Sequence, residues 1–317
     1  MTRVARIPAD CFHPDLREAV SALPELDIFA DLNRTREITR KMFAKMPRDE
    51  EPPPTVETVP AGEGRPAVTV RISRPPQQAG PLPGVLHIHG GGYVLGFAAM
   101  DDPFCRRIAR EANCVVVSVD YRLAPEHPYP AGLEDCYAAL EWMAANAAAL
   151  GIDPKRLAVT GASAGGGLTV ATALLARDRK GPALRLMAPL CPMLDNTNTT
   201  PSSYEILDRR FWNREFNEKA WQLYLGADKA PVPPYAVPAK AEDLSGLPAT
   251  FTFVGGLDLF RDETINFVAG LAQAKVPVEF HLYPGCFHGF ENMLPDCGIS
   301  KKALSDYIAA LRQALHG

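Results

Sequence analysis

The chain has 317 residues, of which 47% are hydrophobic and 22% are charged, a balance typical of a folded globular protein. Its net charge of −4 gives no support for binding to nucleic acid or to an anionic membrane surface. The first residues lack the apolar core of a signal peptide, and no apolar stretch reaches the ~18 residues of a membrane span. Seven cysteines without Cys-x-x-Cys spacing favour reduced thiols. We therefore expect a cytoplasmic protein with no membrane span and no nucleic-acid partner.

Residues 1–50 are predicted to be helical and amphipathic, because apolar side chains recur among polar and charged ones. The run 50–54, Glu-Glu-Pro-Pro-Pro, ends this segment, since consecutive prolines cannot continue a helix. The segment therefore looks like an appendage joined by a stiff linker. Strands are expected next at 55–59 and 67–74, where Val, Ile and Thr alternate with other residues as in half-buried antiparallel strands.

From residue 85 onward, short apolar strands alternate with helices. The expected strands lie at 85–89, 114–119, 157–160, 184–190, 249–254 and 278–283, and the expected helices at 102–111, 132–149, 168–175, 262–274 and 301–315. This alternation predicts parallel βαβ units, and so an α/β fold with a mostly parallel central sheet and helices on both faces. An aromatic-rich stretch at 195–235 interrupts the alternation. It is predicted to be a helical insertion at an end of the sheet, where ligands bind in open α/β folds.

The run 161–165, Gly-Ala-Ser-Ala-Gly, lies between a predicted strand and a predicted helix. This is the context of the Gly-x-Ser-x-Gly nucleophile elbow, in which a serine is exposed on a strained, tight turn. The flanking glycines avoid side chains that would crowd such a turn. Since the pattern alone also fits an ordinary strand-to-helix turn, Ser163 needs a base, an orienting acid and an oxyanion hole elsewhere in the chain.

Three consecutive glycines follow the predicted strand that ends at His89. Gly90, Gly91 and Gly92 leave backbone N–H groups uncovered, which is what stabilisation of a developing oxyanion requires. A phosphate loop is the alternative, but it would need Gly-Lys-Ser/Thr or Gly-x-Gly-x-x-Gly, and neither pattern fits. With a serine elbow downstream, the glycine run predicts an oxyanion hole.

The catalytic histidine is expected after the serine and after the acid in this class of site. Of the three histidines in the last third of the chain, His316 lies at the terminus and His281 lies inside a predicted strand. His288 instead lies in a glycine-flanked loop just beyond that strand, from which an imidazole can reach the strand ends. We therefore predict His288 as the base.

The acid is expected just beyond a strand between the serine and the histidine. Asp258 fits, since it follows the predicted strand at 249–254. Asp262 and Glu263 are rivals, but they lie where the next helix begins, and acidic residues there usually cap the helix. Asp258 is therefore predicted to orient His288 and to stabilise its imidazolium.

A metal site is the other chemistry that the sequence suggests. His87 and His89 share one face of a predicted strand and could begin a zinc site. No third ligand stands nearby at suitable spacing, and His89 already adjoins the glycine run. We expect no metal and no cofactor.

Five motifs in order carry a family resemblance. They lie at 89–93 (His-Gly-Gly-Gly-Tyr), 120–126 (Asp-Tyr-Arg-Leu-Ala-Pro-Glu), 161–166, 257–263 and 288–290. From about residue 50 to its end, the chain resembles the hormone-sensitive-lipase-like branch of the α/β-hydrolases, which includes the bacterial family IV carboxylesterases. The resemblance implies Ser163 as nucleophile, His288 as base and Asp258 as orienter. It also implies oxyanion donors from the backbone of Gly91, Gly92 and Ala164, with His89 organising the glycine loop.

The resemblance also implies a domain organisation. An N-terminal helical cap segment at 1–50 and a cap insertion at 195–240 would cover an α/β-hydrolase core formed by 51–194 and 241–317. One departure from the family is Ala162, where most relatives have Asp or Thr. This difference affects the assignment of the chain to a subgroup of the family more than its expected activity, because no member of the triad is lost.

The expected function is that of a serine carboxylesterase, which hydrolyses short- to medium-chain esters through an acyl-enzyme on Ser163. Its expected partner is a small-molecule ester substrate, and the resemblance also allows a homodimer. Two alternatives stay open. One is a hydrolase of a related amide, carbamate or lactone bond, and the other is a non-catalytic ligand-binding protein on the same scaffold.

Overall fold

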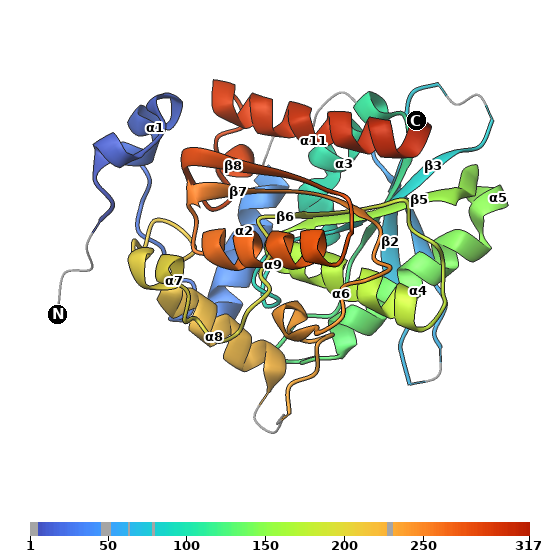
Figure 1. Cartoon of the computed structure of the whole chain (residues 1–317), viewed down its shortest axis with the longest axis horizontal. Helices are drawn as coiled ribbons and strands as arrows, with labels where there is room; N and C mark the ends of the chain where they lie inside the picture. The colour runs from blue at the N-terminus through green and yellow to red at the C-terminus, as the bar shows by residue number, and fades with distance from the viewer. Residues whose placement is uncertain (1–5, 46–51, 63, 78–79, 227–230) are drawn as a thin grey trace.

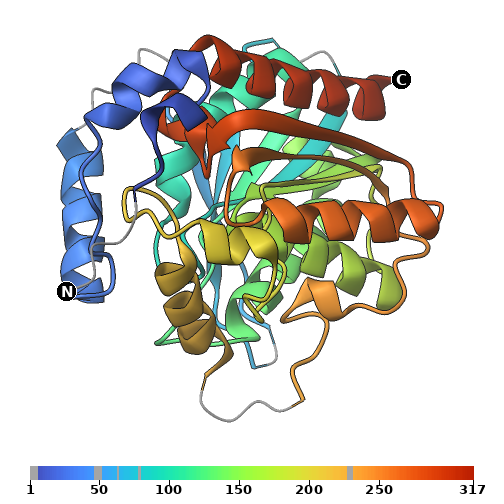
Figure 2. The ribbon, with the colours of Figure 1, turned by 60° about the vertical axis from the view of Figure 1, so that its left-hand side comes forward.

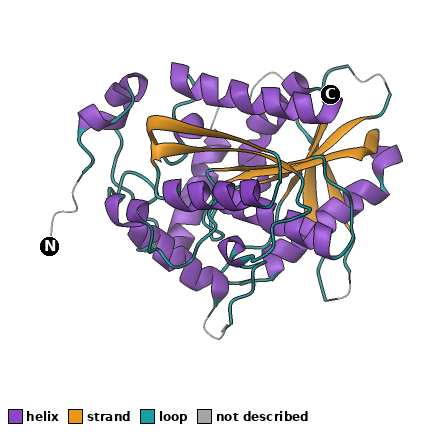
Figure 3. Ribbon diagram, viewed as in Figure 1, coloured by secondary structure: helices purple, strands orange, loops and turns teal. Residues whose placement is uncertain are grey.

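The computed structural model describes residues 6–45, 52–62, 64–77, 80–226 and 231–317. The described residues build an eight-stranded sheet with the order β1-β2-β4-β3-β5-β6-β7-β8 (Figure 3). The strands are β1 (Thr55–Val59), β2 (Val68–Ser73), β3 (Leu82–Ile88), β4 (Val115–Val119), β5 (Ile152–Ala162), β6 (Leu186–Leu190), β7 (Ala249–Leu257) and β8 (Val278–Phe287). β2 pairs antiparallel with β1 and β4, and the other neighbouring strands pair in parallel. The predicted mostly parallel sheet is therefore confirmed.

Helices cover both faces of this sheet, as predicted (Figure 1). One face carries α3 (Asp102–Ala112) and α11 (Gly298–His316), and the other carries α4 (Ala131–Ala145), α6 (Ala164–Asp178) and α9 (Arg261–Gln273). Two shorter helices are α5 (Ala147–Leu150) and α10 (Phe290–Met293). Among the described residues, no helix combines the length and the apolar character that crossing a membrane requires.

The single helix predicted at 132–149 is wrong in one respect, since α4 and α5 are separated at Asn146. The Asn146 side-chain amide donates to the carbonyl oxygen of Trp142 at 2.8 Å. Asparagine competes in this way with the helical hydrogen-bond ladder, and so favours a helix end over a helix interior.

The N-terminal segment is helical only in parts. It contains two 3₁₀ turns, η1 (Ala9–Cys11) and η2 (Pro14–Leu16), and two helices, α1 (Arg17–Ser21) and α2 (Leu32–Lys45). Phe12, Leu16 and Val20 are buried in the same apolar cluster as Phe287 of β8. The expectation of an appendage is therefore wrong for this part, because these side chains help to fill the core. The predicted linker begins at Glu50 and Glu51, which lie outside the described residues.

The insertion between β6 and β7 contains α7 (Pro201–Glu205), α8 (Arg214–Leu225) and the 3₁₀ turn η4 (Pro238–Lys240). Figure 2 shows α7 and α8 at the same end of the molecule as α1 and α2. The backbone N–H of Leu26 donates to the carbonyl of Arg209 at 2.8 Å. The ring of Phe29 packs against Trp212 and Phe216, with centroids 6.4 and 6.0 Å apart. Two segments far apart in the sequence thus form one layer.

An ion pair fixes the loop that follows β4. The Arg122 guanidinium donates to both carboxylate oxygens of Asp135 on α4, at 2.8 and 2.9 Å, and the Arg122 backbone N–H donates to the same carboxylate. Asp135 is fully buried. Because a buried carboxylate is costly without a cation, this pair strongly disfavours any other arrangement of the loop.

We expect Arg122→Ala to lower the free energy of unfolding by about 3 kcal/mol, because it leaves Asp135 buried without its cation. Urea unfolding measures this. Arg179→Ala is the matched control, since its pair with Glu134 is largely exposed (44% and 36% of each side chain) and is expected to contribute less than about 1 kcal/mol. Equal losses from the two variants would contradict the proposed role of the buried pair.

Candidate active site

Ser163 lies in a sharp turn between β5 and α6, as the sequence predicts. Its backbone has φ 59° and ψ −122°, a conformation that non-glycine residues adopt only when the surroundings enforce it. The surroundings here are backbone hydrogen bonds. The Ser163 N–H donates to Leu190 at 2.9 Å, and the Ser163 carbonyl accepts from the N–H groups of Gly167 and Met193 at 3.0 Å. Backbone groups of β6, of the residues just after it and of α6 therefore hold the turn in this conformation.

The two glycines of the elbow permit a close backbone contact that the sequence alone does not reveal. A Cβ atom on Gly161 would lie 2.4 Å from the carbonyl oxygen of Ile88, and one on Gly165 would lie 2.1 Å from the same oxygen. Both distances are far below van der Waals contact. The glycines thus let the elbow pack directly against the end of β3, where the glycine run begins.

The structure brings the side chains of Ser163, Asp258 and His288 together from the ends of three strands. His288 Nδ1 lies 2.8 Å from Asp258 Oδ2, and His288 Nε2 lies 2.9 Å from Ser163 Oγ. A carboxylate can only accept, so the imidazole donates through Nδ1 and is left with Nε2 as an acceptor for the serine hydroxyl. This geometry is that of a nucleophile, a base and an orienting acid.

Burial and hydrogen bonding hold this arrangement in place. Asp258 is fully buried and its second carboxylate oxygen accepts the N–H of Phe260 at 2.9 Å. The Phe260 ring meets the His288 imidazole edge-on, with centroids 5.0 Å apart and an interplanar angle of 85°. Burial lowers the pKa of His288, but the charge of Asp258 and its hydrogen bond raise it, and the net pKa lies above that of free imidazole.

The rival acids bind elsewhere. The carboxylate of Asp262 accepts the N–H of Ser202 at 2.7 Å and pairs with Arg261. Glu263 is buried and accepts the N–H of Leu194 at 2.6 Å, and burial raises its pKa well above the usual range. Both residues therefore fasten the insertion to α9 and do not form the hydrogen bond that Asp258 makes with His288.

The glycine loop lies directly beside the elbow. A Cβ atom on Gly90 would lie 3.5 Å from Ser163 Cβ. Gly91 and Gly92 have φ values of 119° and 60°, which glycine adopts without strain. Among the described residues, no hydrogen bond engages the backbone N–H groups of Gly91, Gly92 and Ala164, and these groups are available to a ligand.

An aromatic side chain from the insertion covers this loop. A Cβ atom on Gly92 would lie 2.2 Å from Cη2 of Trp212, so the indole rests on the glycine backbone. Trp212 Nε1 donates to Asn217 at 3.2 Å, which fixes the ring. The sequence shows that the insertion is rich in aromatic residues, but it does not single out Trp212 as the one that covers the loop.

Arg36 on α2 was not singled out by the sequence analysis. Its guanidinium donates to the carbonyls of Val94 at 2.8 Å and Ala124 at 2.6 Å, and it pairs with Glu126 at 2.7 Å. It thereby joins the N-terminal segment to the glycine loop and to the 120–126 motif. One arginine among the three on an amphipathic helix gives no sequence signal for such a contact.

The two strand histidines have other partners. His87 Nε2 lies 2.7 Å from Asp101, and His89 Nδ1 donates to the Gly90 carbonyl at 2.8 Å. The His89 ring stacks on Tyr121 at 4.2 Å, and the Tyr121 hydroxyl donates to the His89 carbonyl. Burial lowers the pKa of His89, which favours the neutral ring. Both histidines thus organise the end of β3.

One cysteine lies close to the reacting groups. Ligand atoms of Cys191, Asp258 and His288 all lie within 4.8 Å of one another. Cys191 follows β6 directly and is buried. Because Asp258 and His288 are already hydrogen-bonded to each other, we assign this cluster to proton transfer and not to metal binding.

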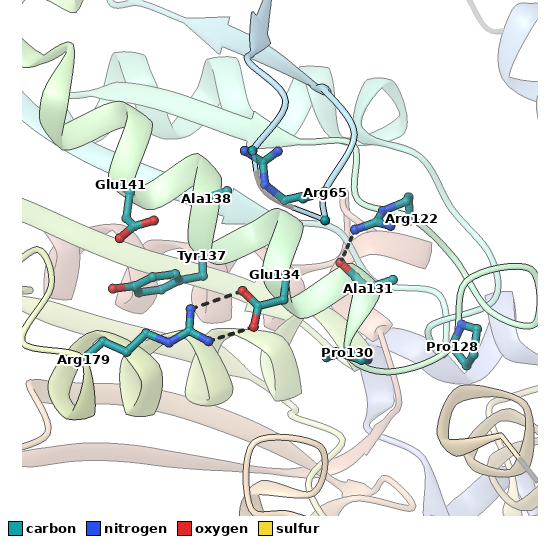
Figure 4. Close-up of a pocket in the computed structure, with 12 residues that line it drawn as sticks. Arg65, Arg122, Pro128, Pro130, Ala131, Glu134, Tyr137, Ala138, Glu141 and Arg179 are labelled. Atoms are coloured by element: carbon teal, nitrogen blue, oxygen red, sulfur yellow. Dashed lines mark hydrogen bonds and ion pairs between the residues drawn. The ribbon is translucent and has the colours of Figure 1, made fainter. Parts of the chain in front are cut away.

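A surface pocket of about 440 Å³ lies apart from these residues, among the loop between β1 and β2, the loop after β4, and α4 (Figure 4). Several of its charged side chains already have partners. Arg179 binds Glu134, and Arg122 donates to the Ala131 carbonyl. Neither the triad side chains nor the glycine loop contribute to its lining. It therefore adds nothing to the chemistry of the site.

Comparison with known proteins agrees with this geometry. Residues 85–292 match the family described as alpha/beta hydrolase fold. Carboxylesterase NlhH of Mycobacterium tuberculosis is 39% identical over 258 residues, covering 80% of this chain and 81% of that protein. Esterase LipI of the same species is 38% identical over 243 residues, covering 76% of each. The structure titled Bacterial Heroin Esterase superposes with a TM-score of 0.90 at 38% identity, covering 96% of this chain and 98% of that one.

These matches extend over both the fold and the motifs at 89–93, 161–166 and 288–290, all of which lie within the matched residues. The chain belongs to the hormone-sensitive-lipase-like branch of the α/β-hydrolase family.

Proposed function

We propose that the protein is a serine carboxylesterase in which Ser163, His288 and Asp258 form the catalytic triad. The observation that carries this is the continuous hydrogen-bond chain from Ser163 Oγ through His288 to Asp258, at 2.9 and 2.8 Å. The named relatives are carboxylesterases and esterases, which supports the same reaction class. Ser163 attacks the ester carbonyl while His288 Nε2 takes its proton, and Asp258 stabilises the imidazolium that forms.

The oxyanion of the tetrahedral intermediate is stabilised by the N–H groups of Gly91, Gly92 and Ala164. Their freedom from other hydrogen bonds and the contact of Gly90 with the elbow support this assignment. His288 then gives its proton to the departing alcohol. Water attacks the acyl-enzyme with His288 again as base, which releases the acid and regenerates Ser163.

The N-terminal segment and the insertion are proposed to act as a cap that limits the substrate. Their mutual packing through Phe29, Trp212 and Phe216, and the position of Trp212 on Gly92, support this role. Bulky rings beside the glycine loop favour short- to medium-chain esters. The seven free cysteines, five of them buried, suit a reducing cytoplasm.

Ser163→Ala is expected to reduce kcat by at least about 10⁴-fold, because the nucleophile is lost while the fold is kept. Hydrolysis of p-nitrophenyl esters from acetate to palmitate measures this, and wild-type rates should be highest for the shorter chains. Ser21→Ala, at an exposed serine of α1, is the control. Undiminished turnover in Ser163→Ala would refute the mechanism, and failure of an organophosphonate to label wild-type Ser163 would favour a non-catalytic ligand-binding protein.

Gly92→Ala is expected to reduce kcat by about 10²-fold or more, comparable to loss of one oxyanion donor. The added Cβ meets Trp212, and the φ of 60° is strained for alanine. Steady-state kinetics on p-nitrophenyl acetate measure the effect. Gly226→Ala is the matched control, since it has φ 70° but its Cβ would meet only Pro128 at 3.7 Å. A similar loss in both variants would argue against a specific role for Gly92.

The pH profile of kcat/KM is expected to fall on the acid side with a midpoint above 6.5, the value of unperturbed histidine. The base must be neutral in the free enzyme, and the pKa of His288 is raised, so activity is lost as pH falls through that raised value. Asp258→Asn removes the charge that raises the pKa, and should move the midpoint down as well as reduce kcat. A wild-type midpoint well below 6.5 would contradict this assignment.

A further inference from the structure

A second carboxyl group lies behind the triad and has no role in the mechanism above. Glu291 is the second residue of α10, three residues after His288, and its side chain is 1% exposed. Its Oε1 accepts from the Asn292 side-chain amide at 3.3 Å, but Oε2 has no hydrogen-bond partner within the described part of the chain. A buried carboxyl with an unsatisfied oxygen destabilises a fold. Its presence is therefore not explained by packing.

The charge of the Glu291 carboxyl bears on groups of the active site. The titratable side chains whose charges bear on it or feel its charge are Cys191 after β6, Asp258 after β7, Cys286 on β8 and His288. Cys191, Asp258 and His288 already form a tight cluster. Glu291 is not part of that cluster, but it follows His288 by three residues, and its buried carboxyl is the second negative group after Asp258 whose charge bears on His288 among the described residues.

Burial raises the pKa of Glu291 to about 7, against the opposing effects of a hydrogen bond from its own backbone N–H and of the His288 charge, while the charge of Asp258 raises the pKa further. The influence is mutual, since negative charge on Glu291 raises the pKa of His288. The protonation of each of these two groups therefore depends on the charge of the other.

We propose that Glu291 is a positioning residue that acts through His288, as a second negative charge that stabilises the imidazolium formed during ester hydrolysis. This inference rests on the proposed function and deepens it. Protonated Glu291 is neutral and leaves Asp258, which is hydrogen-bonded to His288, as the counter-charge of the imidazolium. Ionised Glu291 adds to Asp258, makes His288 a stronger base and assists proton removal from Ser163.

The test is the pH profile of kcat/KM for Glu291→Gln, which keeps the shape of the side chain and removes its charge. We expect the acid-side midpoint to move to lower pH by about half a unit or more, because His288 loses an anion that favours its protonation. Relative to wild type, the loss of kcat/KM in Glu291→Gln should therefore be about threefold smaller below the midpoint than at high pH. At high pH the weaker base of the variant slows proton transfer. Glu291→Met should shift the profile in the same direction.

Glu263→Gln is the matched control, since it also removes a buried carboxyl but one that hydrogen-bonds the Leu194 backbone. It should lower Tm without moving the midpoint. The proposal would be overturned if Glu291→Gln lowered kcat/KM by the same factor at every pH. It would also be overturned if neither Glu291 variant moved the midpoint. An NMR titration of the His288 imidazole in wild type and Glu291→Gln gives the same shift without turnover, so it separates failure of this inference from failure of the esterase assignment.

Discussion

The contact between the nucleophile elbow and the end of β3 is the constraint on which the rest of the site depends. Gly161 and Gly165 leave no room for a side chain between the elbow and the carbonyl of Ile88. This contact places Ser163 beside the glycine loop, so that the attacking oxygen and the unengaged N–H groups share one space. A side chain at either glycine would push the elbow away from the end of β3 and so separate Ser163 from the glycine loop.

The parallel sheet supplies the remaining parts at the same edge. Asp258 and His288 follow adjacent strands, β7 and β8, which pair in parallel, and so their side chains emerge together. Because this edge is buried beneath the insertion and the N-terminal segment, charges there interact more strongly than they would in water. The same burial that strengthens the Asp258–His288 hydrogen bond also makes the Glu291 carboxyl destabilising to the fold. A destabilising side chain that is kept at this place indicates a role.

Much of the core could be predicted from sequence because its elements are short, strongly patterned and bounded by turns. The strand at 114–119 is apolar except for Ser118, the strand at 249–254 consists mostly of β-branched and aromatic residues, and the loop position of His288 is visible from its flanking glycines. The N-terminal segment was predicted less well. Leu16 and Val20 look like one face of an exposed amphipathic helix, but they are buried against side chains more than 180 residues away, such as Phe211. Contacts of that range, like those of Arg36 and Trp212, leave no periodic signal.

The three bonds of Arg36 make the N-terminal segment part of the glycine loop's support. The guanidinium joins a helix within the first 45 residues of the chain to the carbonyls of Val94 and Ala124. Sequence changes in this segment are therefore expected to affect the turnover rate as well as the fit of the substrate. Exchange of the N-terminal helices for others would therefore remove a cation that holds the glycine loop in place.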